Sequence, residues 1–427
     1  MPARKLGIPG SKKMQTNLEE NEGLNLDIRR GRDASVGKKE QRVLQFVYLT
    51  HDGITSMIFN ICEFMDRKKV NFDYLAFSKG ETYAHDKITQ LKGRPVIIDV
   101  DNIPNPFIRS IKKYYGVYQA VRKYRYSIIH VNASTPYDIL IAFAARLGGA
   151  KRVVFHSHNS KGDKRFRRDI FIPICRVLVP VLVSDYIACS DAAAKYMFPS
   201  WIYKKKAYVL LHNGIDVERF SFNASEREKK RKELGFAENI VFGNIGRFHL
   251  QKNHSFLLKI FSEILKRKDN AKLLLIGTGQ LEESLREEAK QLSIDKSVIF
   301  YGTTTEIPQM LWTMDAYLMP SLYEGLPVTG IEAQAAGLPM LVSDSVSREL
   351  HLTDLVHYMS LDRSASEWAN AAIALLGQTR RNYTERLKEQ GYDIRSIAVQ
   401  LEEIYEKKNK SGIDRQRRGP FGRTSMD

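Results

Sequence analysis

The chain has 427 residues, of which 43% are hydrophobic and 27% are charged, and its formal net charge is +17 at pH 7. These values are typical of a large globular protein with room for two domains of ordinary size. The longest aliphatic stretch near the cysteines, residues 177–183, is far shorter than the ~20 residues of a membrane span, and the polar start has no signal-peptide core. Cys62, Cys175 and Cys189 stand in apolar runs and are expected to be reduced thiols in a reducing compartment.

The first 206 residues are predicted to hold an extension and one domain. Residues 1–41 are polar, with clustered opposite charges, and are expected to be disordered. A domain is expected over residues 42–206, where apolar runs alternate with stretches of helical spacing. Because helices separate most of its strands, this domain should be a doubly wound parallel sheet. The predicted strands cover residues 43–49, 72–77, 95–100, 127–132, 152–158 and 185–190.

Several polar residues stand at the ends of these strands. Asp99 and Asp101 follow the third strand, where a strand-end turn explains both of them. His130, His156 and His158 close the fourth and fifth strands and invite interpretation as a metal site. No Cys or carboxylate stands beside them at zinc spacing, so we expect no metal there. A structural role for a single strand-end histidine remains an alternative.

The excess positive charge lies entirely in the first half of the chain. Residues 1–210 hold 36 Lys and Arg against 19 Asp and Glu, whereas residues 211–427 hold 30 of each kind. Two stretches, 108–126 and 160–183, mix basic residues with aromatic or aliphatic ones, a pattern expected of helices on an anionic membrane surface. Ordinary solvated helices are the alternative. A nucleic-acid interface is not favoured, since the glutamate segment described below has no role in one.

A second parallel α/β domain is predicted over residues 207–392, after a linking segment at 207–216. Its expected strands begin near Ile240, Lys272, Val298, Ala316, Met340 and His357. The strand that begins near Ile240 ends in a tight turn, and Arg247 and Lys252 lie in the loop between this strand and the next helix. Two cations five residues apart can bind one diphosphate, the arginine as a planar fork and the lysine as a point charge.

The stretch SLYEGLPVTGIEAQAAGLP, residues 321–339, is the most informative part of the chain. It places Glu324 at the carboxyl edge of a buried strand and Glu332 in the first turn or so of the following helix. Ligands bind at that edge of a parallel sheet, and the N–H groups of a helix N-terminus suit an anion. The alternative is that Glu332 offsets the helix dipole and Glu324 is a solvated loop charge.

Four segments in the same order, namely FHSHNS, NGIDVERF, GRFHLQKN and the paired-glutamate segment, resemble the retaining glycosyltransferases of family 4. The resemblance covers roughly residues 43–407. It implies the GT-B fold, in which two Rossmann-like domains face each other across a cleft, with the acceptor on the first domain and a nucleotide-sugar donor on the second. The segment 393–410 resembles the family's terminal helix, which packs back on the first domain, and residues 411–427 form a basic tail.

The resemblance assigns roles in the first domain to two residues. His156 matches the histidine that faces the transferred sugar, as a hydrogen-bond donor. Gly53 matches the glycine loop after the first strand, where the backbone approaches donor phosphates and acceptor. The family usually has two glycines there, and Asp52 replaces the first, which puts a backbone contact at position 52 in doubt.

In the second domain the resemblance implies that Arg247 and the lysine five residues on hold the diphosphate. Glu332 would accept hydrogen bonds from the ribose, and Glu324 would contact the sugar hydroxyls. The backbone near Val328 and Thr329 would meet a phosphate. Whether Glu324 attacks the anomeric carbon or only positions the sugar stays open, with the resemblance favouring positioning and same-face transfer.

Asp99 and Asp101 also match the Asp-x-Asp pattern with which the other major glycosyltransferase architecture holds a divalent metal. We expect this match to be structural, and expect no metal and no cofactor. The hypothesis is therefore a metal-independent transferase of a UDP-sugar to a saccharide or lipid-linked acceptor in exopolysaccharide, capsule or glycolipid synthesis. It would be cytoplasmic and peripheral at the inner face of the cell membrane. A nucleotide-sugar epimerase and a non-catalytic sugar-nucleotide-binding protein are the alternatives.

Overall fold

The computed structural model describes residues 41–49, 53–80, 82–159 and 171–407. The predicted disordered extension, apart from its last residue, therefore lies outside the described residues. The same holds for the basic residues 160–170 and for the basic tail at 411–427. Two α/β domains follow one another along the chain, and each is described by itself.

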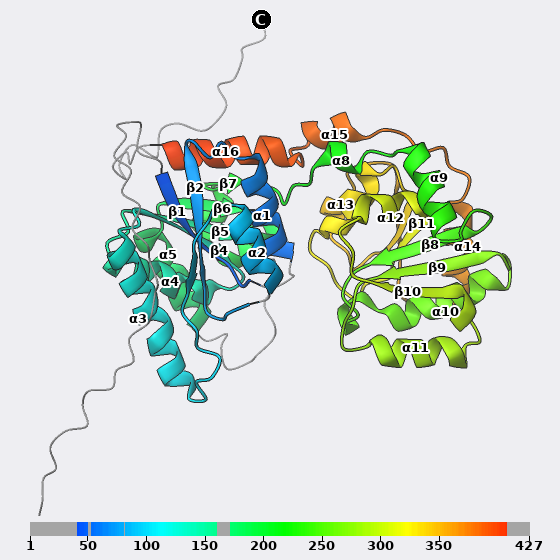
Figure 1. The fold of residues 1–427 in the computed structure, drawn as a ribbon, viewed down its shortest axis with the longest axis horizontal. Helices are drawn as coiled ribbons and strands as arrows, with labels where there is room; N and C mark the ends of the chain where they lie inside the picture. Colours follow the sequence, from blue (N-terminus) through cyan, green and yellow to red (C-terminus); the bar gives the residue numbers. More distant parts are fainter. Residues whose placement is uncertain (1–40, 50–52, 81, 160–170, 408–427) are drawn as a thin grey trace, which may run out of the picture. The chain divides into compact units, whose positions relative to one another are not determined.

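The N-terminal domain contains a sheet of seven parallel strands in the order β3-β2-β1-β4-β5-β6-β7 (Figure 1). Its central strands are almost fully buried, as expected of a parallel sheet covered by helices on both faces. The strands are β1 Gln41–Phe46, β2 Val70–Ala76, β3 Pro95–Ile97, β4 Ile128–Ala133, β5 Arg152–Ser157, β6 Asp185–Ala188 and β7 Val209–Leu210.

Helices cover both faces of this sheet and enclose two separate apolar cores. One face carries α1 Gly53–Phe64, α2 Thr82–Gln90 and the last of the described helices, α16 Ile394–Glu406. The other face carries α3 Pro106–Tyr124, α4 Ile139–Leu147, α5 Ile172–Leu182, α6 Asp191–Met197 and α7 Ser200–Lys204. None of the described helices has the length and apolar content that crossing a bilayer requires.

The C-terminal domain contains a sheet of six parallel strands in the order β10-β9-β8-β11-β12-β13. Its strands are β8 Ile240–Ile245, β9 Ala271–Ile276, β10 Val298–Gly302, β11 Ala316–Met319, β12 Met340–Ser343 and β13 Val356–Met359. One face is covered by α8 Val217–Phe220, α12 Ile307–Thr313, α13 Val328–Ala335 and α15 Thr384–Glu389. The other is covered by α10 His254–Leu265, α11 Glu282–Gln291 and α14 Ala365–Ala374. Helix α9, Ala224–Glu233, packs beside α12.

The chain returns to the N-terminal domain through α16, which packs beside α1 (Figure 1). Ile215, on the way into the C-terminal domain, pairs with Asp393, on the way out. The buried Arg152 of β5 then caps the end of α16, because its guanidinium donates to the carbonyl oxygens of Tyr405 (3.1 Å) and Lys407 (2.8 Å). The helix is thereby fixed at both ends.

The predicted fold class, two doubly wound parallel α/β sheets, is confirmed. Twelve predicted strands are present with small shifts of their ends, and two details differ. The third strand stops at Ile97, although the N–H groups of Ile98 and Val100 still donate to the carbonyls of Ala76 (2.9 Å) and Phe77 (3.2 Å). The segment 207–216, expected to be a linker, contributes β7 at the edge of the first sheet.

Candidate functional site

Arg247 and Lys252 lie in the loop after β8, as predicted. Within the described residues, the exposed side chain of Arg247 has no ion-pair or hydrogen-bond partner. Lys252 closes a short 3-10 turn, η3 Leu250–Lys252, and its stem crosses directly over Gly246. A Cβ at position 246 would lie 2.9 Å from Cε of Lys252, so glycine makes room for this stem. The loop therefore presents the exposed guanidinium of Arg247, and Gly246 makes room for the stem that carries the ammonium group of Lys252.

The loop after β11 is bonded to the turn that holds Lys252. The N–H of Leu322 donates to the carbonyl of Gln251 (2.8 Å), and Asn253 Nδ2 donates to the carbonyl of Pro320 (3.0 Å). Asn253 adopts the left-handed conformation with φ 56°, which asparagine tolerates better than most residues. These bonds fix one strand-end loop against the other.

Lys252 and Glu324 contact each other across these two loops. Nζ of Lys252 lies 2.6 Å from Oε1 of Glu324, and the two side chains are only 16% and 10% exposed. The lysine approaches Oε1 as an ion pair and not along a hydrogen-bond direction. Gln251 Nε2 donates to the other carboxylate oxygen at 3.1 Å. The carboxylate predicted to contact the sugar is thus held in place by the turn that carries the lysine predicted to bind the diphosphate.

Tyr317, a buried residue of β11, links the elements of this site. Its hydroxyl accepts the N–H of Ile245 (3.1 Å) and lies 3.3 Å from Oγ1 of Thr329. Burial raises the pKa of Tyr317 well above its usual value, and the charges of Glu332 and Glu324 add to that effect. Both glutamates follow β11 in the chain, Glu324 in the loop after the strand and Glu332 in α13.

Glu332 is the fifth residue of α13 and stands at the start of its second turn, slightly deeper than predicted. Its side chain remains partly exposed. Desolvation by the surrounding protein raises the pKa of Glu332 to about 7, and the charge of Arg219 opposes the shift. The side chain is still in contact with water, so the raised pKa comes from the protein atoms packed around the carboxyl group and not from its complete burial. A carboxyl with this pKa changes charge near neutral pH.

The N-terminus of α13 offers backbone donors. Its N-cap is Pro327, which makes no side-chain cap. Within the described part of the chain, no hydrogen bond from the N–H groups of Val328 or Thr329 is found. Uncapped N–H groups at a helix N-terminus are suited to bind an anion, as the sequence predicted for these two positions.

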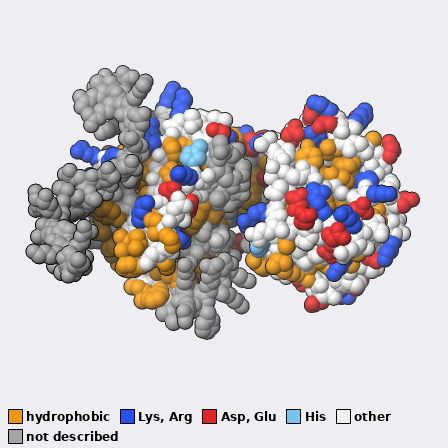
Figure 2. All heavy atoms as spheres, turned by 60° about the horizontal axis from the view of Figure 1, so that its bottom comes forward, with side chains coloured by type: hydrophobic (Ala, Val, Ile, Leu, Met, Phe, Trp, Pro, Cys, Tyr) orange, Lys and Arg blue, Asp and Glu red, His pale blue; other side chains and the backbone are white. Residues whose placement is uncertain are grey.

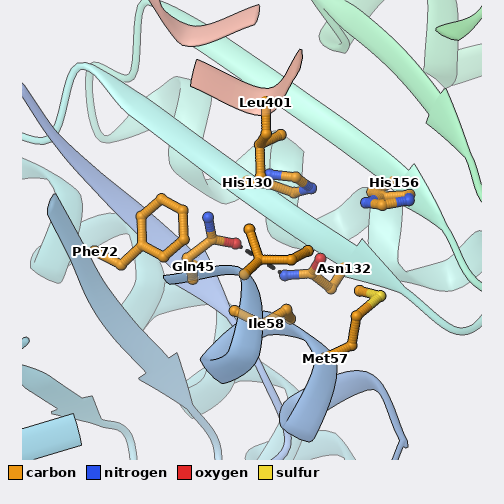
Figure 3. Close-up of a pocket in the computed structure, with 9 residues that line it drawn as sticks. Gln45, Met57, Ile58, Phe72, His130, Asn132, His156 and Leu401 are labelled. Carbon is orange, nitrogen blue, oxygen red and sulfur yellow. Dashed lines mark hydrogen bonds between the residues drawn. The ribbon is translucent and has the colours of Figure 1, made fainter. Parts of the chain in front are cut away.

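In the N-terminal domain, His156 is buried and lines a small cavity of about 10 Å³ (Figure 3). Burial lowers the pKa of His156 well below its usual value and that of His130 to about 3, and His158 adds to both effects. Both imidazoles are therefore neutral at physiological pH. Within the described residues, Nε2 of each ring has no hydrogen-bond partner. His156 is thus placed beneath α1, inside the domain.

A buried polar network runs from α16 to this cavity. The Tyr405 hydroxyl lies 2.6 Å from Nδ1 of His130 and accepts Nε2 of Gln45 at 2.9 Å. Gln45 in turn accepts Nδ2 of Asn132 at 3.0 Å, the bond drawn in Figure 3. Asn132 Oδ1 lies 3.2 Å from Nε2 of His158, whose ring is 4.0 Å from that of His156. Helix α16 therefore supports the histidines of β4 and β5.

Two other predicted features can be placed. Gly53 is the first residue of α1, while Asp52 lies outside the described residues. Asp99 accepts the N–H of Asp101 at 3.1 Å, a turn-forming contact, and pairs with Lys79 at 3.8 Å. In the described ranges no group of three His, Cys, Asp or Glu could hold a metal ion.

Sequence reasoning missed Tyr317, Gln251 and Tyr405. A tyrosine inside a predicted buried strand was one available signal, since a buried hydroxyl needs a partner. Nothing in the local sequence could pair Tyr405 with Gln45, because 360 residues separate them.

Two family models match the chain. "Glycosyltransferase Family 4" matches residues 51–219, and "Glycosyl transferases group 1" matches residues 226–393. The "Putative glycosyltransferase EpsF" of Bacillus subtilis is 32% identical over 383 residues, which span 87% of this chain and 97% of that one. An Escherichia coli "UDP-Gal:alpha-D-GlcNAc-diphosphoundecaprenol alpha-1,3-galactosyltransferase" is 26% identical over 56% of this chain and 62% of its own.

Solved structures share the fold. The structure of Anabaena Alr3699/HepE in complex with UDP superposes with a TM-score of 0.68 at 18% identity, covering 86% of this chain and 99% of that one. WaaG, a glycosyltransferase involved in lipopolysaccharide biosynthesis, superposes with a TM-score of 0.63 at 14% identity, covering 85% and 99% of the two chains.

Proposed function

Since this chain belongs to the family-4 glycosyltransferases and has the GT-B fold, we propose that it is a retaining, metal-independent transferase of a UDP-sugar. The observation that carries the proposal is the contact between Lys252 and Glu324. This contact supports the proposal because it joins the lysine that we assign to the diphosphate and the carboxylate that we assign to the sugar hydroxyls. The UDP complexes of Alr3699/HepE and the UDP-galactose donor named for the Escherichia coli relative support UDP as the nucleotide.

On the C-terminal domain each site residue has one task. Arg247 and Lys252 bind the diphosphate and stabilise the charge that develops on it, the largest electrostatic contribution expected in such a transfer. The N–H groups of Val328 and Thr329 bind a phosphate oxygen. Glu332 accepts hydrogen bonds from the ribose.

At the reacting centre, the bond between the anomeric carbon and the β-phosphate oxygen breaks, and UDP leaves with the electron pair. The acceptor hydroxyl oxygen bonds to the anomeric carbon from the same face, and its proton passes to the departing phosphate oxygen. Glu324 positions the sugar hydroxyls in this scheme. His156, neutral and with an unpartnered Nε2 within the described residues, supplies a hydrogen bond to the sugar, and Gly53 lets the backbone approach the substrates.

The acceptor is a saccharide or a lipid-linked saccharide used in extracellular polysaccharide or glycolipid synthesis. The names of the Bacillus subtilis and Escherichia coli relatives support this class, the second because it names a diphosphoundecaprenol acceptor. An acceptor of that kind would make the protein a cytoplasmic enzyme at the inner face of the cell membrane.

The test is incubation of the protein with a panel of nucleotide sugars, with and without lipid-linked saccharides, and measurement of released UDP. Acceptor-dependent release of UDP, with the anomeric configuration kept in the product, is the expected result. Conversion of a nucleotide sugar into its epimer without UDP release would show an isomerase instead. Binding without any product, in wild type and in Glu324→Gln alike, would show a non-catalytic protein.

A further inference from the structure

Helix α3 exposes an apolar stripe to solvent. Phe107, Ile111 and Tyr115 recur every four residues, so they lie along one side of the helix, and they are 73%, 53% and 57% exposed. Farther along α3, Val117 and Val121 contribute to the domain core. The first half of α3 thus carries exposed apolar side chains, whereas the exposed side of a surface helix is normally polar.

The next two helices repeat this arrangement. In α4, Phe143 and Leu147 are one turn apart and exposed. In α5, Ile174, Val177 and Val181 follow the helical period, and the two valines are 68% and 75% exposed. Both helices also bury a second apolar side in the same core.

The three stripes belong to one surface, because α3 packs against α4 and α4 packs against α5. Figure 2 shows hydrophobic side chains gathered together with basic ones on the N-terminal domain. We call this surface the apolar face. It consists of Phe107, Ile108, Ile111, Tyr115, Phe143, Leu147, Ile174, Val177 and Val181. Contiguous exposed apolar surface of this kind marks a contact with another partner.

Charge identifies that partner. No Asp or Glu occurs anywhere in α3, α4 or α5. Exposed basic residues, among them Lys112, Arg122 and Lys123, flank the stripe of α3. A second copy of this chain would bring the same positive charge against itself. An anionic bilayer instead offers negative headgroups to the cations and hydrocarbon to the apolar side chains. Surface helix α11 of the other domain differs, since it carries four glutamates besides its basic residues.

We propose that the apolar face inserts into an anionic phospholipid bilayer and seats the N-terminal domain on it. The apolar face would bring the N-terminal domain to the membrane, where the acceptor of the proposed function lies. The docking proposal rests on the proposed function only for its biological purpose. It refines the expectation from sequence, in which basic residues mixed with aromatic or aliphatic ones lie on an anionic surface, by assigning the contact to the exposed apolar side chains. Insertion of apolar side chains persists in high salt, whereas attraction between exposed charges is screened at 1 M salt, where the Debye length is about 3 Å.

The experiment is flotation of the intact chain with phosphatidylcholine vesicles, with and without phosphatidylglycerol, across a salt series. The test variant is Val177→Glu/Val181→Glu, and both positions are well exposed, so the fold should tolerate the change. The matched control is Val399→Glu, which changes a 53% exposed valine on α16, on the other face of the same sheet.

The wild type and Val399→Glu should float with anionic vesicles and retain part of their binding at 1 M salt. The double variant should lose roughly tenfold or more in vesicle affinity, because two charges would have to enter the bilayer. UDP binding, measured in parallel, should stay unchanged in all three proteins. If the wild type did not bind UDP, that result would contradict the proposed function but not the docking proposal.

Three results would overturn the docking proposal. The first is equal flotation of the double variant and the wild type. The second is complete loss of wild-type binding at 1 M salt, which would show attraction by charge alone. The third is a wild-type dimer in sedimentation velocity that the double variant dissociates, since the apolar face would then join two copies of this chain.

Discussion

Nζ of Lys252 lies 2.6 Å from Oε1 of Glu324, so the cation proposed for the diphosphate neutralises the carboxylate proposed for the sugar. Removing either partner leaves the other unpaired in a largely enclosed position, and removing both does not. The effects of Lys252→Met and Glu324→Gln on thermal stability should therefore be non-additive, by roughly 0.5 to 3 kcal/mol. Scanning calorimetry of the two single variants and the double variant measures this coupling, and strict additivity would contradict the ion pair.

The same pair predicts opposite effects on ligand binding. Lys252→Met should weaken UDP binding about tenfold or more, because a charge-assisted contact of ~1.5 to 3 kcal/mol is lost. Glu324→Gln should keep or improve UDP affinity, since the ammonium group is released, and should lose transfer. Calorimetric titration with UDP and a UDP-release assay measure both. Full turnover by Glu324→Gln would remove this residue from the site.

Arg247→Gln should weaken UDP binding by a similar factor without changing the unfolding temperature. The reason is that its guanidinium is exposed and, among the described residues, has no partner whose loss could destabilise the fold. Titration with UDP and calorimetry on the same sample give the two readings. An unchanged affinity would show that Arg247 does not contact the diphosphate.

Donor binding should depend on pH through Glu332. Its pKa is raised to about 7, so the carboxylate that accepts ribose hydroxyls is present above pH 7 and is lost as the pH falls below it. Affinity for UDP-glucose should therefore fall toward pH 6, by up to about tenfold per pH unit. UDP-glucose suits this test because it lacks a terminal phosphate that titrates near pH 6. Glu332→Gln should show a flat profile over the same range, and a flat wild-type profile would contradict the role.

Arg152→Met should destabilise the N-terminal domain by ~3 kcal/mol or more, because it uncaps α16 and leaves Asp185, 2.6 Å from the guanidinium, without that partner. The unfolding temperature should fall by roughly 6 to 12 °C. The control is Arg395→Met, which breaks the more exposed pair with Asp216 and should cost less than about 1 kcal/mol. Equal effects of the two changes would contradict the capping role.

Chelation should leave transfer intact, because Asp99 accepts the N–H of Asp101 in a turn. The double variant Asp99→Asn/Asp101→Asn should also stay active, since asparagine forms the same turn. Activity that disappears with chelator and returns with Mn²⁺ would show a metal-dependent enzyme.

The fold was predictable because a parallel sheet leaves a strong local signal. Each buried strand is a short apolar run, and the runs beginning at Ile240, Ala316 and Met340 correspond to strands of the structure. The ends were less predictable: the third strand stops at Ile97, although Ile98 and Val100 are also apolar.

The sequence predicted where the site lies in the fold but not which of its side chains contact one another. Arg247, Lys252 and Glu324 all follow predicted strand ends, which indicated that they lie at one edge of the sheet. The structure shows Lys252 and Glu324 in contact. Spacing could not reveal that Tyr317 lies under Thr329, since that depends on how α13 packs over β11. Nor could it show that desolvation holds Glu332 near neutrality, because the pKa depends on atoms from several elements.

The return of α16 to the first sheet makes the N-terminal domain discontinuous in sequence. Its core needs Ile394, Ile397 and Leu401, and Tyr405 completes its buried polar network. On the ribosome these residues emerge after the whole C-terminal domain, whose strands are contiguous between residues 240 and 359. The order of folding should therefore reverse the order of synthesis, with the second domain complete before the first. A fragment that stops after β7 would expose the surface that α16 covers and should be prone to aggregate.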